Sequence, residues 1–192
     1  MEERRILIID AHPDPDPARF IHALAAAYQS GAQGHETRLL RLADVDIPLL
    51  RASHDWLEGT PAADVARAQA DIAWAEHIVL FYPLWLGDVP ALLKAFLEQV
   101  MRPDFAFRYR EGGLPEKLLK GRSARIVVTM GMPAFFYRLV YGAHSVKSLE
   151  RNILKFVGIR PVERTIIGGV ETSEEQRLGW LREMEELGAA GA

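Results

Sequence analysis

The segment that follows the apolar run 78–82 contains residue types that could bind a flat ring system. Its sequence over residues 83–88 is Pro-Leu-Trp-Leu-Gly-Asp, and a helix-period stretch begins near Pro90. Aromatic and aliphatic side chains offer an apolar wall, while the peptide groups of a loop offer N–H donors and C=O acceptors. This combination suits a planar ligand with one apolar and one hydrogen-bonding half. Trp85 and Leu86 could also be core or interface residues, which is the commoner role of a loop tryptophan.

A second segment, residues 10–20, follows the apolar run 6–9 and could hold an anion. It contains neither of the glycine-rich phosphate loops, G-x-G-x-x-G and G-x-x-x-x-G-K-[ST], which argues against the dinucleotide and nucleoside-triphosphate sites that use them. The N-terminus of a helix binds anions through its free N–H groups and its dipole. His12, Arg19 and the backbone of a following helix are therefore candidates for a phosphate site. A proline-stiffened turn with solvated aspartates is the alternative.

The same segment also resembles the opening of the zinc-dependent N-acetyl-sugar deacetylases, whose loop reads A-H-P-D-D-E. Residues 11–14 match its first four positions, but Pro15 stands where the second aspartate would bind the metal. The six histidines form no H-x-x-H or H-x-x-x-H pair. We therefore expect no metal site.

Tyr137, Tyr141 and His144 are spaced i, i+4 and i+7, so they would share one face if this stretch were helical. Phenols and an imidazole on one face could donate hydrogen bonds and move protons, and histidine does so near neutral pH. Alternatively, Tyr141 packs and His144 makes a cap or a local hydrogen bond.

Short apolar runs alternate with helix-period segments, which indicates a parallel sheet covered by helices. The expected strands are residues 6–9, 36–42, 78–82, 124–129 and 162–167. The expected helices cover residues 18–30, 61–74 (with Thr60 as N-cap), 90–100 and a stretch that ends at 156. A terminal helix follows, which begins with a capping box of Ser173 and Gln176 and is expected to fray from Gly188.

Five strands alternating with five helices predict an α/β, flavodoxin-like doubly wound parallel sheet of order 2-1-3-4-5 with helices on both faces. We expect residues 1–192 to form a single domain, and a six-stranded Rossmann sheet is the alternative. In such sheets ligands bind beyond the carboxyl ends of the strands. The loops after strands one, three and four should therefore meet at one edge and form the site.

The composition excludes several classes of function. The chain has 192 residues and 23 basic against 26 acidic side chains, so it lacks the basic surplus of nucleic-acid binders. The absence of cysteine excludes disulfides, iron–sulfur clusters, thiolate zinc sites and a cysteine nucleophile. No apolar run approaches the roughly 20 residues of a membrane span, and no signal-peptide core precedes the first strand. We expect a cytoplasmic protein with no nucleic-acid partner and no membrane insertion.

Residues 83–94 resemble the NAD(P)H:quinone oxidoreductase family, which has a flavodoxin-like fold of the second type. The family carries F-P-L-x-W-x-G-x-P-A-x-L-K-G, and this chain has PLW at 83–85, Gly87 and PALLK at 90–94. The resemblance implies a homodimeric flavin-dependent NAD(P)H oxidoreductase that reduces a quinone-like acceptor by two-electron hydride transfer. No long C-terminal extension follows that could cover an adenosine, so we expect FMN as cofactor, with FAD possible and NAD(P)H as co-substrate.

The resemblance also implies which residues form the site. The cofactor-binding residues would be His12, Arg19, Phe20, Pro83, Leu84, Trp85, Leu86, Thr129, Met130 and Gly131. Tyr137 and His144 match the family's catalytic tyrosine and histidine, with one residue inserted between them. They would stabilise the negative charge that hydride transfer builds on the flavin. Phe107, Tyr109 and Tyr141 are the expected substrate-pocket residues, and the segment of the first two lines the partner subunit's pocket in the family.

In its flavin-binding loops the chain departs from the family pattern at two places. Pro17, Ala18, Arg19 and Ile21 stand where the family often has serine or threonine and then asparagine, so Arg19 or backbone amides would have to replace the hydroxyl donors. Met132 replaces one glycine of the T-T-G-G flavin loop.

Three alternative functions remain open. The protein could be a cytosolic ancillary subunit of a potassium efflux system, which would contact a membrane partner peripherally. It could also be a flavodoxin-like electron carrier, or a family member that has lost its cofactor.

Overall fold

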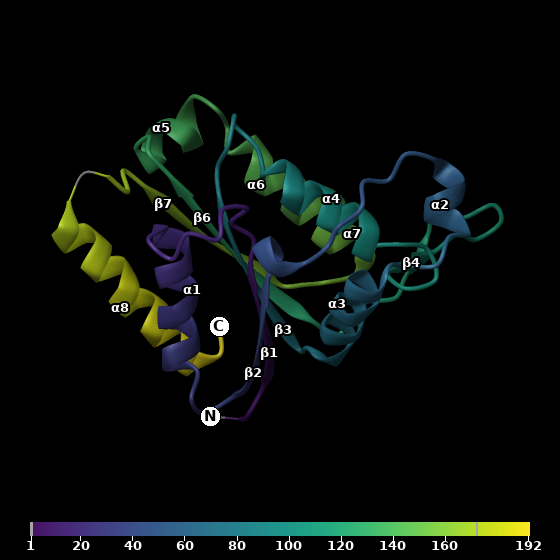
Figure 1. The fold of residues 1–192 in the computed structure, drawn as a ribbon, viewed down its shortest axis with the longest axis horizontal. Coiled ribbons are helices and arrows are strands. Elements are labelled where there is room, and N and C mark those ends of the chain that lie inside the picture. Colours follow the sequence, from purple (N-terminus) through teal and green to yellow (C-terminus); the bar gives the residue numbers. More distant parts are fainter. Residues whose placement is uncertain (1, 172) are drawn as a thin grey trace.

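The fold is a parallel sheet with helices on both faces, seen in a computed structural model that describes residues 2–171 and 173–192 (Figure 1). The main sheet consists of β1 (Arg5–Asp10), β2 (Glu36–Arg41), β3 (His77–Pro83), β6 (Ser123–Met130) and β7 (Val162–Gly168). Their order is β2-β1-β3-β6-β7 and all neighbours are parallel. The predicted flavodoxin-like order 2-1-3-4-5 is confirmed, and the six-stranded alternative is excluded.

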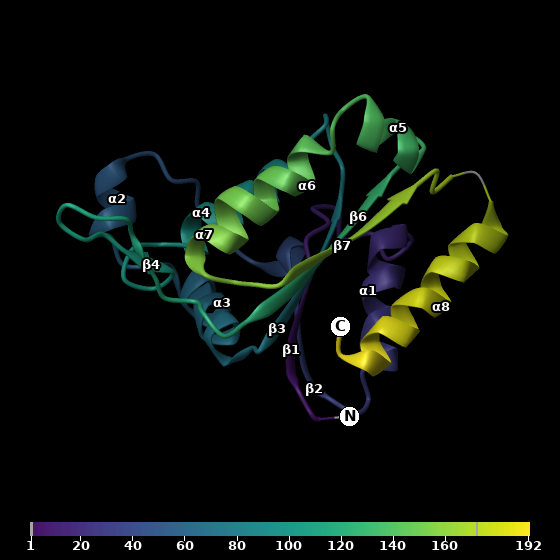
Figure 2. The ribbon, with the colours of Figure 1, turned by 180° about the vertical axis from the view of Figure 1, so that it is seen from behind.

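The helices are α1 (Phe20–Gly31), α2 (Ser53–Leu57), α3 (Ala63–Trp74), α4 (Ala91–Val100), α5 (Ala134–Leu139), α6 (His144–Ser148), α7 (Lys155–Val157) and α8 (Glu174–Ala190). Helices α1 and α8 cover one face of the sheet, and α3, α4, α6 and α7 lie on the other (Figures 1 and 2). Both chain ends lie at the end of the sheet opposite α5 (Figure 1).

Each face of the sheet has its own hydrophobic core, because successive side chains of a strand point to opposite faces. Ile6 and Ile8 of β1 pack in a core with residues of α1 and α8. Leu7 and Ile9 pack in the other core, with residues of α3 and α4. A parallel strand buried on both faces therefore reads as a continuous apolar run, as it does in this sequence.

The terminal helix continues further than expected. Ser173 caps α8 by accepting a hydrogen bond from the Gln176 N–H at 3.3 Å, which confirms the predicted start. The predicted fraying from Gly188 is wrong, since α8 extends to Ala190. A Cβ on Gly188 would lie 2.0 Å from the Tyr28 carbonyl oxygen of α1, so this glycine permits the close contact that holds the helix end.

The start of α3 also differs from the prediction. Helix α3 begins at Ala63 rather than Pro61, and the Asp64 carboxylate in its first turn accepts a hydrogen bond from the Asp46 N–H at 3.0 Å. The helix start is thus fixed by the preceding loop rather than by Thr60. Residues 102–121 contain a small antiparallel pair, β4 (Phe107–Arg108) and β5 (Glu116–Lys117), outside the main sheet.

Within the residues that the structure describes, no helix combines the length and the apolar character needed to cross a bilayer.

His77, at the start of β3, is a buried histidine outside the candidate site. Its Nδ1 lies 2.7 Å from the Ser123 Oγ, and its Nε2 has no hydrogen-bond partner among the described residues. Burial, with smaller contributions from the charges of Arg4 and Arg125, lowers the pKa of His77 to about 3. The folded protein therefore keeps this imidazole neutral at pH values where an unfolded chain would protonate it.

The stability of the protein is expected to fall as the pH decreases from about 6.5 towards 3, because the unfolded chain takes up a proton that folded His77 does not. Between pH 7 and pH 5 this one group should reduce the free energy of unfolding by about 2 kcal/mol. Urea unfolding at the two pH values checks this against His77→Gln, which cannot titrate. Equal pH dependence in both proteins would disprove the assignment.

Candidate functional site

A pocket of about 460 Å³ lies beyond the carboxyl ends of the central strands. Its lining includes nine of the ten residues expected to bind a cofactor, namely His12, Arg19, Phe20, Pro83, Leu84, Trp85, Thr129, Met130 and Gly131. These residues come from the carboxyl ends of β3 and β6, from the start of α1 and from the loops after β1, β3 and β6, so the structure brings the three predicted segments together. A pocket of this volume is within the usual range for small-molecule and cofactor sites.

Backbone hydrogen bonds fix these loops relative to one another. The Leu84 N–H donates to the Thr129 carbonyl at 2.8 Å, and the Val170 N–H donates to the Met130 carbonyl at 3.4 Å. The Ala11 N–H donates to the Phe81 carbonyl at 2.8 Å at the base of the first loop. The edge of the pocket is thus a continuation of the sheet and not a set of independent loops.

Three residues that line the pocket were not expected from the sequence, namely Val170, Glu171 and Arg177. Ala18 and Ile21, from the first segment, also line the pocket. Val170 and Glu171 follow β7, whose carboxyl end lies at the same edge, so the general rule for such sheets could have included this loop. The Arg177 guanidinium carbon lies 5.6 Å from the centre of the Phe20 ring, which places a second cation at the pocket beside Arg19.

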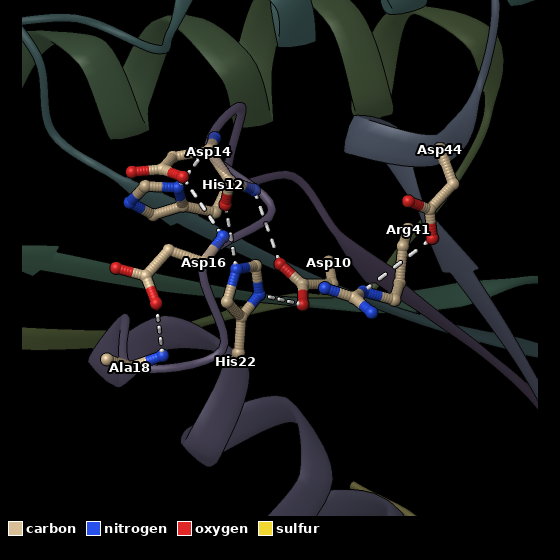
Figure 3. A network of polar contacts seen from close by, with 8 residues as sticks. All are labelled: Asp10, His12, Asp14, Asp16, Ala18, His22, Arg41 and Asp44. Carbon is tan, nitrogen blue, oxygen red and sulfur yellow. Dashed lines mark hydrogen bonds and ion pairs between the residues drawn. The ribbon is translucent and has the colours of Figure 1, made fainter.

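The first loop is held by a regular series of side-chain to backbone hydrogen bonds (Figure 3). The Asp10 carboxylate accepts a hydrogen bond from the His12 N–H at 3.3 Å. The Asp14 carboxylate accepts one from the Asp16 N–H, and the Asp16 carboxylate accepts one from the Ala18 N–H, both at 3.0 Å. The Asp14 N–H donates to the His12 Nδ1 at 3.0 Å. Each side chain thus accepts from the residue two positions later, which explains the alternation of acceptors with proline and alanine in this loop.

His22, in the first turn of α1, connects the loop to β1. Its Nδ1 contacts the Asp10 carboxylate and its Nε2 lies 2.9 Å from the Asp14 carbonyl oxygen. The imidazole can donate to both oxygens only when both ring nitrogens carry a hydrogen. His22 could not be recognised as a site residue from the sequence, because its contact with Asp10 is formed only in the folded protein.

His12 is adjacent to this pair and lines the pocket. Its Nδ1 accepts a hydrogen bond, its ring centre lies 5.3 Å from that of His22, and its ring meets Trp85 edge-on at 5.7 Å. Burial, followed by the charge of His22, lowers the pKa of His12 below its ordinary value. His12 therefore presents a neutral imidazole to the pocket at neutral pH.

The pocket has the two kinds of surface that a flat ligand with an anionic tail requires. Leu84, Trp85 and Met130 supply apolar and aromatic surface, and a Cβ on Gly131 would meet no atom within 4 Å, so the pocket is open there. Arg19 is the N-cap residue of α1 and its side chain makes no capping hydrogen bond. The first-turn N–H groups of a helix point outward and attract anions. These residues fit a flavin mononucleotide.

Leu86 is the one predicted cofactor residue that does not line this pocket. It is fully exposed with a φ of 47°, and it borders a neighbouring pocket of about 490 Å³ that also contains Trp85 and Ser145.

Tyr137, Tyr141 and His144 do not share a helical face, because the stretch that contains them is not one continuous helix. Helix α5 ends at Leu139 and α6 begins at His144, because Gly142 and Ala143 between them have left-handed φ values of 60° and 50°. Tyr137 is buried, and its phenol oxygen accepts a long hydrogen bond from the Val146 N–H at 3.4 Å. Tyr141 and His144 are exposed. None of the three lines the pocket at the sheet edge.

Phe107 and Tyr109 lie in a different part of this chain. Phe107 is buried and contacts the rings of Trp56, Phe156 and Tyr109, whereas Tyr109 is exposed. A role of these side chains in the pocket of a second copy stays a prediction.

Comparisons with known proteins agree with this fold. The chain is 33% identical over 104 residues to the "FMN-dependent NADH:quinone oxidoreductase 1" of Colwellia psychrerythraea, and this match spans 54% of this chain and 52% of that protein. It is 28% identical over 193 residues to the "FMN-dependent NADH:quinone oxidoreductase 2" of Listeria innocua, covering 87% of this chain and 88% of that protein. The solved structure of Smu.1420 from Streptococcus mutans superposes with a TM-score of 0.82 at 28% identity, covering 97% and 99% of the two chains.

The match to a family covers nearly the whole chain. The profile of the Flavodoxin_2 family, described as the flavodoxin-like fold, matches residues 4–187. This range includes all five strands of the main sheet and every loop that lines the pocket. The chain therefore belongs to the Flavodoxin_2 family, as its sheet order and its site at the carboxyl edge had indicated.

Proposed function

We propose that this protein is an FMN-dependent NAD(P)H:quinone oxidoreductase. The observation that carries the proposal is the convergence of nine expected cofactor residues on one pocket at the carboxyl edge of the sheet. The names of the Colwellia and Listeria relatives, which include FMN, NADH and quinone, support the same cofactor and reaction. When bound, FMN supplies a group that accepts a hydride from NAD(P)H and returns two electrons to a quinone-like acceptor.

The chain's own residues would hold the cofactor at both ends. Leu84, Trp85 and Met130 would cover the flat ring. The peptide groups of residues 129–131 and the carbonyl groups of Pro83 and Leu84 would hydrogen-bond its polar half. Arg19, with Arg177 and the first turn of α1, would face the phosphate. His12 would contribute a neutral imidazole that can hydrogen-bond without adding charge.

Tyr137 and His144 are proposed to manage protons and charge during turnover, and Tyr141, Phe107 and Tyr109 to contact the substrate. We propose a homodimer, because Leu86, Phe135, Leu139 and Val140 are exposed apolar side chains that a second copy could cover. Leu86 would then meet the cofactor from the rim of the assembled site. We further propose that the chain is one domain and works in the cytoplasm.

Anaerobic absorbance measurements test the function. Protein loaded with FMN should lose its absorbance near 450 nm when NADH or NADPH is added and regain it when a simple benzoquinone follows. Comparison of the two nucleotides gives the preferred co-substrate. Stable FMN binding without bleaching by either nucleotide would support the electron-carrier alternative and reject the proposed enzyme. Failure to bind FMN or FAD would leave only the fold.

A further inference from the structure

The loop beside the proposed phosphate end holds two carboxylates around one arginine. Arg19 lines the pocket, and Asp14 and Asp16 lie next to its guanidinium outside the lining. Arg19 is held by Asp14, whose Oδ2 lies 2.6 Å from Nη2 and 2.8 Å from Nε of the guanidinium. The Asp16 carboxylate lies 3.6 Å from the same Nη2. One cation therefore faces two anions, so this group of three side chains has a net charge of −1.

The two carboxylates are fixed in place by the loop. Asp14 accepts the Asp16 N–H and Asp16 accepts the Ala18 N–H, both at 3.0 Å, so each carboxylate occupies a backbone donor. The hydrogen bond from Asp16 and the contact with Arg19 lower the pKa of Asp14, and this carboxyl is therefore ionised throughout the neutral range. The loop thus offers its donors to its own carboxylates and not to a bound anion.

The other charged groups around the pocket do not offset this arrangement. Arg177 and Glu171 both line the pocket and have opposite charges. His12 is held neutral, and the Asp10 carboxylate is paired with His22 beneath the loop. When Asp14 and Asp16 are counted with the lining residues Arg19, Arg177 and Glu171, two cations face three anions. This end of the site then lacks the cationic surplus that a phosphate site normally has.

We propose that Asp14 and Asp16 are specificity-determining residues of the cofactor site, which oppose the phosphate of FMN by holding Arg19 and by repelling the anion. As a result the protein prefers FMN over riboflavin only weakly. The inference rests on the proposed function, because it assumes that a flavin binds in this pocket with its phosphate towards Arg19.

The variants Asp14→Asn, Asp16→Asn and the double variant test this inference. Asparagine keeps the side-chain oxygen that accepts the backbone N–H, so the loop geometry is retained while the charge is removed. Dissociation constants are measured by quenching of flavin fluorescence for FMN and for riboflavin at low ionic strength. Glu76→Gln, at the opposite end of the sheet beside Arg5, is the matched control for the loss of one negative charge.

Each Asn substitution should strengthen FMN binding by about 5- to 10-fold and leave riboflavin binding unchanged, because only FMN carries the charge that the carboxylates repel. Added salt should reduce the difference, and Glu76→Gln should show neither effect. An unchanged ratio of FMN to riboflavin affinity in the double variant would overturn the inference while leaving the proposed function intact. If the wild-type protein binds neither flavin, the proposed function itself fails.

Discussion

Replacement of Gly131 by phenylalanine is expected to weaken FMN binding by at least about 100-fold while leaving the protein folded. Gly131 lines the pocket at the end of β6, and a Cβ built on it meets no atom within 4 Å. Its φ is not in the left-handed region, so a larger side chain is compatible with the backbone. The new ring would extend into the space that the flavin needs.

Gly131→Ala is the matched control, because one methyl group fits in the open space and should change the affinity by only a few-fold. Flavin-fluorescence titration gives the affinities, and circular dichroism with a thermal unfolding curve shows that both variants are folded. Wild-type FMN affinity in folded Gly131→Phe would mean that the flavin binds elsewhere.

The second large effect is expected on turnover and not on binding. His144→Ala should retain FMN but slow the NAD(P)H:quinone reaction by at least about 100-fold, since loss of a proton-transfer group typically costs that much or more. The ring of His144 lies over Gly142 in the turn between α5 and α6, where a Cβ on Gly142 would be 2.8 Å from its Nε2. The histidine is exposed and available to a ligand at this surface.

His54→Ala is a suitable control because it removes an exposed histidine that pairs with Glu58 far from this turn. Stopped-flow traces separate the reduction of the flavin by NAD(P)H from its reoxidation by the quinone, so they show which step His144 serves. Full turnover in His144→Ala would reject its role and would leave Tyr137, whose buried phenol contacts the Val146 N–H, as the proposed residue.

Most of the fold and the cofactor pocket could be predicted because they depend on local and periodic signals. The runs at β1 and β3 are apolar on both faces, which is typical of strands in a parallel sheet that is covered on both sides. The rule that ligands bind at the carboxyl edge then placed His12, Trp85 and Gly131 in one site, as observed.

The features that were missed depend on tertiary contacts. The turn at Gly142 and Ala143 interrupts the stretch in which Tyr137, Tyr141 and His144 have helical spacing, because two left-handed residues break the helix there. His22 can be recognised as part of the site only in the structure, where its Nδ1 contacts the Asp10 carboxylate. Arg177 reaches the pocket from the last helix of the chain, and no local motif marks it.

Amide hydrogen exchange with and without FMN tests the central claim most directly, because it reports where the flavin binds. The account predicts slower exchange in three segments, residues 16–21, 84–87 and 129–132, with no change in the hairpin of β4 and β5. Protection confined to the hairpin or to α2 and α3, with these three segments unaffected, would contradict it.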